Sequence, residues 1–109
     1  MDLFKRFIFI KITPYFMEHL SIKDIHDRLE GLKGWEMISY GEISKEFEFS
    51  DFKQAMDFVH KAGEEAERQK HFPDITMRQN KVTITLTTPE ANGLTYEDFK
   101  LAKIIEQLI

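Results

Sequence analysis

Apolar positions recur every three or four residues in some stretches of the chain and every second residue in others. The first stretch with helical spacing opens at Ser21, a suitable N-cap residue, and Asp24 follows three positions later. The apolar positions that share one face behind this cap are Ile22, Ile25, Leu29 and Leu32. We therefore expect a helix that begins after Ser21 and packs this face on the core.

Segments in which apolar and polar residues alternate predict two hairpins. Residues 35–40 and 43–49 form the first pair around a turn at Gly41 and Glu42, and the second strand has Ile43, Lys45, Phe47 and Phe49 on one side. The second pair is 75–79 and 81–87, with a tight turn at Asn80. In its last strand Val82, Ile84 and Leu86 alternate with lysine and threonines, which is typical of a strand with one buried face.

Two further helices are predicted. Ser50 is the expected cap of a long one that ends near Gln69, and Thr95 is the expected cap of a last one that runs through Leu108, with Asp98 completing a capping box. The apolar stripe of the long helix contains Phe52, Ala55, Met56, Val59, Ala62, Gly63 and Ala66. Its small members favour close packing against a sheet or another helix.

The element order α-β-β-α-β-β-α predicts a two-layer α+β fold, an antiparallel four-stranded sheet with helices on one face. Residues 20–109 would form this domain, and residues 1–19 would form an N-terminal extension. Within the extension, Phe7 to Ile12 favours an additional strand because β-branched and aromatic residues dominate it. A surface anchor, or sequence upstream of the domain proper, are the alternatives.

Composition narrows the classes of function. The net charge of −4 argues against a dedicated nucleic-acid binder, which would have a basic face. The absence of cysteine excludes disulfide and thiolate chemistry. The apolar run near the N-terminus is shorter than the roughly 20 residues of a spanning helix, so no membrane association is expected. A domain of 109 residues has a thin core. Packing against a second subunit would add burial, so we expect a homodimer or homotetramer. The absence of cysteine fits a reducing compartment, and we expect the cytoplasm.

Several segments together resemble the pterin-4a-carbinolamine dehydratases, from about Leu20 to Leu108. The matching segments are F-x-F-x-D-F at 47–52, Ala55, Phe58, Ala62-x-x-x-Ala66-Glu67, H-F-P at 71–73, K-V-T-I-T-L-T-T at 81–88, G-L-T-x-x-D at 93–98, and Leu101-Ala102. The resemblance implies dehydration of a 4a-hydroxytetrahydropterin to the quinonoid dihydropterin, without a metal or organic cofactor. Imidazole suits the proton transfers of this reaction because it titrates near neutral pH.

The family's histidine set is only partly present. His71 occupies the first histidine position and is the expected catalytic residue, whereas Phe72 and Pro89 occupy the positions of the second and third histidines. Neither replacement transfers a proton through its side chain. Gln79 stands where the family has an aromatic residue. The resemblance also implies substrate contacts, which we expect from Glu67, Phe72, Pro73, Thr87, Thr88 and Asp98.

Each candidate has a structural explanation as well. His71 follows a helix end, where a histidine often serves as a polar cap; Asp98 completes a capping box; and Glu67 lies in an acidic, solvent-facing run. Phe72 is expected to be buried against the sheet or to line the pocket. His19, His26 and His60 match nothing in the family and are expected to be solvated.

Two functions follow from these observations. One positioned acid or base contributes about 10²–10⁴ in rate, so a chain with His71 alone would be a weakened dehydratase. The alternative is a non-catalytic interaction scaffold on the same fold. The wider family includes a dimerisation cofactor of a homeodomain transcription factor and a RuBisCO assembly factor, and the segment Phe72 to Ile75 is similar to the latter group.

Overall fold

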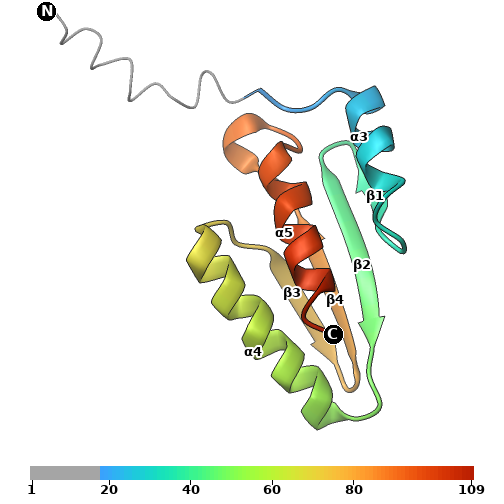
Figure 1. The fold of residues 1–109 in the computed structure, drawn as a ribbon, viewed down its shortest axis with the longest axis vertical. Coiled ribbons are helices and arrows are strands. Elements are labelled where there is room, and N and C mark those ends of the chain that lie inside the picture. Colours follow the sequence, from blue (N-terminus) through green and yellow to red (C-terminus); the bar gives the residue numbers. More distant parts are fainter. Residues whose placement is uncertain (1–17) are drawn as a thin grey trace, which may run out of the picture.

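The computed structural model describes residues 18–109, which form one antiparallel sheet and three α-helices (Figure 1). The predicted strand at Phe7 to Ile12 lies outside these residues. The elements in chain order are α3 (Ile22–Leu29), β1 (Glu36–Ser39), β2 (Glu42–Glu48), α4 (Phe52–Gln69), β3 (Asp74–Arg78), β4 (Lys81–Leu86), the 3₁₀ helix η1 (Pro89–Ala91) and α5 (Tyr96–Glu106). This order confirms the predicted α+β fold, with strand ends that differ from the prediction by about one residue.

The four strands are ordered β1-β2-β4-β3, so the two hairpins meet at β2 and β4 in the centre of the sheet. Register places Ile43 opposite Leu86 and Phe47 opposite Val82, and all four side chains are buried. The neighbouring pair Ser44 and Thr85 lies on the opposite face, where the two hydroxyls are 3.1 Å apart. Helices α4 and α5 cover the apolar face (Figure 1), as the alternation predicted.

Lys45 is the exception to the alternation, because it belongs to the apolar face of β2 and pairs with Ile84. Its ammonium group lies 2.6 Å from Glu106 Oε2 and 3.0 Å from the Lys33 carbonyl oxygen. The same ammonium group lies 4.8 Å from the centre of the Phe47 ring. The apolar stem therefore packs in the core while the charge is neutralised at its edge.

Helix α4 differs from the prediction in its cap and in its buried face. Asp51, rather than Ser50, is the N-cap, and its carboxylate accepts a hydrogen bond from the Gln54 amide at 2.9 Å. The buried positions are Ala55, Phe58, Ala62 and Ala66. Phe52 and Met56 were expected on this face but are 59% and 46% exposed. Within residues 18–109, Phe52 and Met56 therefore form an uncovered apolar stripe on the first two turns of α4.

A tight loop links β4 to α5. Thr88 and Gly93 pair through their backbones, and Asn92 takes a left-handed conformation at φ 56°. The turn between β1 and β2 packs closely against this loop: a methyl group on Gly41 would lie 2.9 Å from Gly93 Cα. On the other side, a methyl group on Gly93 would lie 2.8 Å from His19 Cβ. Only glycine fits between these neighbours, and the loop is held in place from both sides.

Candidate functional site

The end of helix α4 fixes the backbone of His71. Lys70 takes a left-handed conformation at φ 57°, its amide donates to the Glu67 carbonyl, and the His71 amide donates to the Ala66 carbonyl at 3.1 Å. This pair of hydrogen bonds is the Schellman motif, which reverses the chain at the helix end. The reversal turns the His71 side chain toward the first turn of α5, where it is only 13% exposed.

Asp98 is positioned by the N-terminus of α5. Thr95 is the N-cap, and Asp98 is the third helical residue of the predicted capping box. The Thr95 amide donates to Asp98 Oδ2 at 2.9 Å. Asp98 is fully buried, so every lone pair of its carboxylate depends on a protein donor.

Thr88 supplies a second donor to the same oxygen. Its hydroxyl lies 2.6 Å from Asp98 Oδ2 and 2.9 Å from the Thr95 hydroxyl. The loop that pairs Thr88 with Gly93 returns the chain to this point, so residues from the end of β4 and the start of α5 meet. Both threonines are buried.

His71 completes the cluster. Its Nε2 lies 2.6 Å from Asp98 Oδ1, the carboxylate oxygen that the threonines leave unoccupied. Residues 18–109 form no hydrogen bond to the other ring nitrogen, Nδ1. The arrangement is a buried carboxylate that orients a partly exposed imidazole, which is the geometry of a general acid or base with a positioning partner.

Not all predicted site residues join this cluster. His71, Thr88 and Asp98 are in direct contact, whereas Glu67 is exposed and lies 3.5 Å from Lys70. Phe72 is 60% exposed, so the expectation that it is buried against the sheet is wrong. Pro73 and Thr87 are half-buried; Pro73 lies two residues after His71, and Thr87 directly precedes Thr88.

Pro89 is the first residue of η1, at a position where the missing N–H is not needed. It therefore has a structural role in the loop. His19, His26 and His60 are exposed, as expected. Among residues 18–109, no group of three or more histidine, aspartate or glutamate side chains is placed to hold a metal ion, and no helix in this range could span a membrane.

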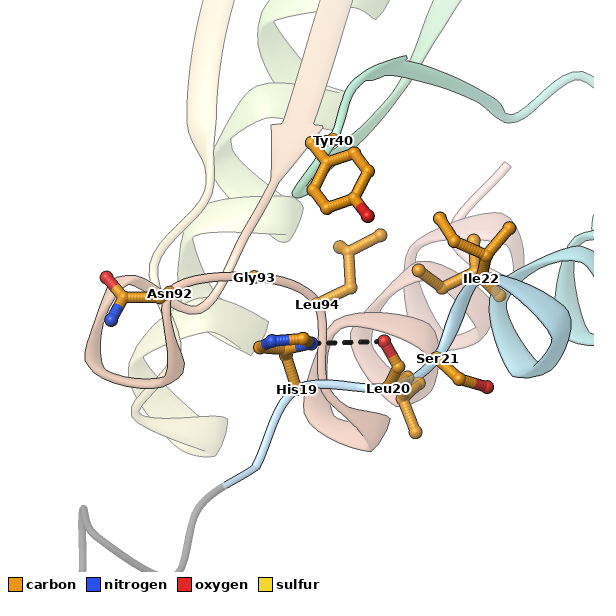
Figure 2. A pocket seen from close by; sticks show the side chains of 9 residues that line it. His19, Leu20, Ser21, Ile22, Tyr40, Asn92, Gly93 and Leu94 are labelled. Carbon is orange, nitrogen blue, oxygen red and sulfur yellow. Dashed lines mark hydrogen bonds between the residues drawn. The ribbon is translucent and has the colours of Figure 1, made fainter.

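A small cavity of about 90 Å³ is lined in part by Asn92 and Gly93 of the loop between β4 and α5 (Figure 2). Tyr40, Leu94 and the His19 ring surround it, and the His19 ring nitrogen Nδ1 lies 3.3 Å from the Leu20 carbonyl. Neither His71 nor Asp98 lines this cavity. None of the cluster residues lines the cavity, so the two are distinct.

Sequence reasoning missed Thr95 as a member of the cluster, because it assigned that residue only to the cap. The signal was present, since a threonine cap and an acid three residues later must approach each other. What sequence could not show is that the Thr88 hydroxyl reaches the same carboxylate from another element.

The family model described as Pterin 4 alpha carbinolamine dehydratase matches residues 18–108. A candidate pterin-4-alpha-carbinolamine dehydratase of Acidobacterium capsulatum is 46% identical over 93 residues, which are 85% of this chain and 100% of that protein. One of Sulfurisphaera tokodaii is 40% identical over 93 residues, which are 85% of this chain and 99% of that protein.

Two solved structures are similar. A transcriptional coactivator/pterin dehydratase from Brucella melitensis superposes with a TM-score of 0.80 at 30% identity, over 84% of this chain and 98% of that one. A pterin dehydratase-like protein, identified as a RuBisCO assembly factor in the alpha-carboxysome, gives a TM-score of 0.60 at 19% identity, over 69% of this chain and 88% of that one. The second likeness shows the fold alone.

Proposed function

Since this chain belongs to the pterin 4 alpha carbinolamine dehydratase family, we propose that it binds a 4a-hydroxytetrahydropterin beside His71 and dehydrates it at a reduced rate. In this reaction the C4a–O bond breaks, the hydroxyl leaves as water with an added proton, and a ring nitrogen gives up a proton. The protons balance, so a group that accepts one and returns it is not consumed.

The observation that carries the proposal is the 2.6 Å contact between His71 Nε2 and the fully buried Asp98. A histidine that merely capped the helix would need no buried carboxylate. Here the carboxylate holds the ring in one orientation and leaves Nδ1 available, so that the imidazole is prepared for proton transfer.

The rate is reduced because one imidazole serves both proton transfers. The side chains of Phe72 and Pro89 have no proton to give, and each lost acid or base removes up to about 10²–10⁴ in rate, with less than additive losses. A substrate held between the His71 segment and the end of β4 would have the backbone of Thr87 and Thr88, the Pro73 ring and the exposed Phe72 ring as neighbours. Glu67, on the last turn of α4, would lie at the edge of this site.

A cytoplasmic homodimer or homotetramer completes the proposal. The support for the oligomer is the uncovered stripe of α4, where Phe52 and Met56 are exposed, with open space beside the neighbouring Gly63. A small domain gains stability when it buries such a surface against a second copy.

The same stripe favours the second candidate function, an interaction scaffold that holds a protein partner without turnover. A scaffold needs an exposed apolar surface, which Phe52 and Met56 provide, and it does not need the missing histidines.

A direct assay separates the two functions. The 4a-hydroxytetrahydropterin is generated in situ, and its decay is followed with wild-type protein, His71→Ala, and His60→Ala as the control. His60 is an exposed histidine of α4 outside the cluster. The dehydratase proposal expects wild type and His60→Ala to accelerate the decay equally, and His71→Ala to lose about 10²–10⁴ in rate, the range for one acid or base. Decay at the uncatalysed rate with wild-type protein would leave only the scaffold.

A further inference from the structure

The hydrogen bonds around Asp98 have only one consistent direction, and this direction determines where the proton of His71 lies. An ionised carboxylate is an acceptor only, and each group that contacts Asp98 from the threonine side is a donor: the Thr88 hydroxyl and the Thr95 amide, both to Oδ2. Oδ2 therefore accepts both of these hydrogen bonds, and Oδ1 accepts from His71 Nε2.

The threonine hydroxyls confirm that the direction is fixed. A hydroxyl has one proton, and that of Thr88 is given to Asp98. The 2.9 Å contact between the two hydroxyls must then be donated by Thr95. The Thr95 oxygen in turn accepts from the Glu97 amide at 3.3 Å. The chain of donors thus runs from Glu97 through Thr95 and Thr88 to Asp98, and it cannot be reversed because it begins at a backbone N–H.

From this geometry we propose that Asp98, held by Thr88 and Thr95, keeps neutral His71 as the Nε2–H tautomer, and that Nδ1 is the nitrogen that exchanges protons with the substrate. Asp98 and Thr88 are then positioning residues, since both are buried and act through the imidazole. This inference rests on the proposed function for its chemistry. Nδ1 takes the proton of the pterin ring nitrogen and returns it to the leaving hydroxyl, so the imidazole ends as it began.

The substitution Asp98→Asn provides a sharp test. The amide oxygen of an asparagine has to face the Thr95 amide, because a side-chain NH₂ group there would oppose another donor. The NH₂ group would then face His71 Nε2, which could only accept. The tautomer should invert, with the proton on Nδ1, as happens when the aspartate of a Ser-His-Asp triad is replaced by asparagine.

The tautomer is read by long-range ¹H–¹⁵N correlation spectra of the histidine rings, recorded on full-length protein at a pH where the rings are neutral. His71→Gln identifies the His71 signals among those of His19, His26 and His60. We expect a protonated Nε2 and a bare Nδ1 in wild type, and the reverse in Asp98→Asn. The control is Asp24→Asn. Asp24 is the third residue after the N-cap Ser21 of α3, as Asp98 is the third residue after the N-cap Thr95 of α5, but it lies away from His71.

Wild-type protein with the proton on Nδ1 would overturn the proposal, whether or not any variant folds. So would an Asp98→Asn protein that keeps the proton on Nε2. The spectra require no turnover, so they remain decisive if the dehydratase assay fails. If wild type is active, Asp98→Asn should lower kcat by about 10²–10⁴ with a much smaller change in KM, and Asp24→Asn should change neither.

Discussion

The indole N–H of Trp35 donates to Glu106 Oε2 at 2.8 Å and so joins the start of the sheet to the last turn of α5. The same oxygen accepts the Lys45 ammonium group. One carboxylate therefore satisfies a buried indole and a lysine on the apolar face of β2, and it links three segments that are far apart in the sequence.

Replacing this carboxylate should destabilise the whole domain. We expect Glu106→Ala to lower the free energy of unfolding by about 1–3 kcal/mol, because the buried Trp35 indole N–H would lose its acceptor and Lys45 would lose its counter-charge, keeping only the Lys33 carbonyl. Urea denaturation measures the change. Glu48→Ala removes an exposed carboxylate from β2 and should stay within about 0.5 kcal/mol. Equal midpoints for the two variants would show that the cluster contributes nothing.

Restoring the missing histidines should raise dehydration. Phe72 and Pro89 are both exposed, and the first position of a 3₁₀ helix accepts residues other than proline, so both positions should tolerate histidine. We expect Phe72→His with Pro89→His to accelerate the reaction by one or more orders of magnitude, within the roughly 10²–10⁴ that one positioned imidazole supplies. Each single change should do less, because the groups share one set of protons.

The matched control for restoration is Phe52→His, which places a histidine at another exposed phenylalanine, on the opposite end of α4. It should leave the rate unchanged. A double variant that binds pterin yet gains no rate would mean that the His71 segment and the η1 loop no longer face a common substrate.

The left-handed residue at the end of α4 predicts a stabilising substitution. Lys70 has φ 57°, a conformation that costs an L-residue about 1 kcal/mol relative to glycine. Lys70→Gly should therefore raise the free energy of unfolding by up to about 1 kcal/mol. Lys61→Gly, in the interior of the same helix, should lower it by a similar amount. Changes of the same sign in both variants would contradict the role assigned to this helix end.

A charge on the uncovered stripe of α4 should disrupt assembly. If copies of the chain pack through this stripe, Met56→Lys would bury an unpaired ammonium group in the interface, and sedimentation velocity should show smaller species than wild type. Gln54→Lys adds the same charge to the same helix outside the stripe and should leave the size unchanged. A monomeric wild type at micromolar concentration would end the oligomer proposal.

Sequence periodicity predicted the sheet well because burial on one face imposes a strict alternation. Even Lys45 was placed on the correct side of β2, although nothing in the sequence showed that Glu106 would neutralise it. The α4 cap was assigned to Ser50 rather than Asp51, since two adjacent cap-forming residues cannot be ranked by type alone.

The stripe of α4 and the histidine cluster show where sequence is insufficient. Phe52 and Met56 have the periodicity of core residues, but they lie on a side of α4 that the rest of residues 18–109 leaves exposed. The contact between Thr88 and Asp98 depends on how a loop returns to its start, which periodicity does not encode. The family pattern identified Asp98, and only the fold shows that it contacts His71.

The contact between Gly41 and Gly93 has a consequence for how this domain can change over time. A side chain at either position would push on the backbone of the other, so the residues permitted at the two positions are not independent. A substitution at Gly41 would shift the loop that carries Thr88, and with it the carboxylate that orients His71. The substitutions that Gly41 can accept are therefore limited by the histidine cluster, although the turn that contains Gly41 does not contact this cluster.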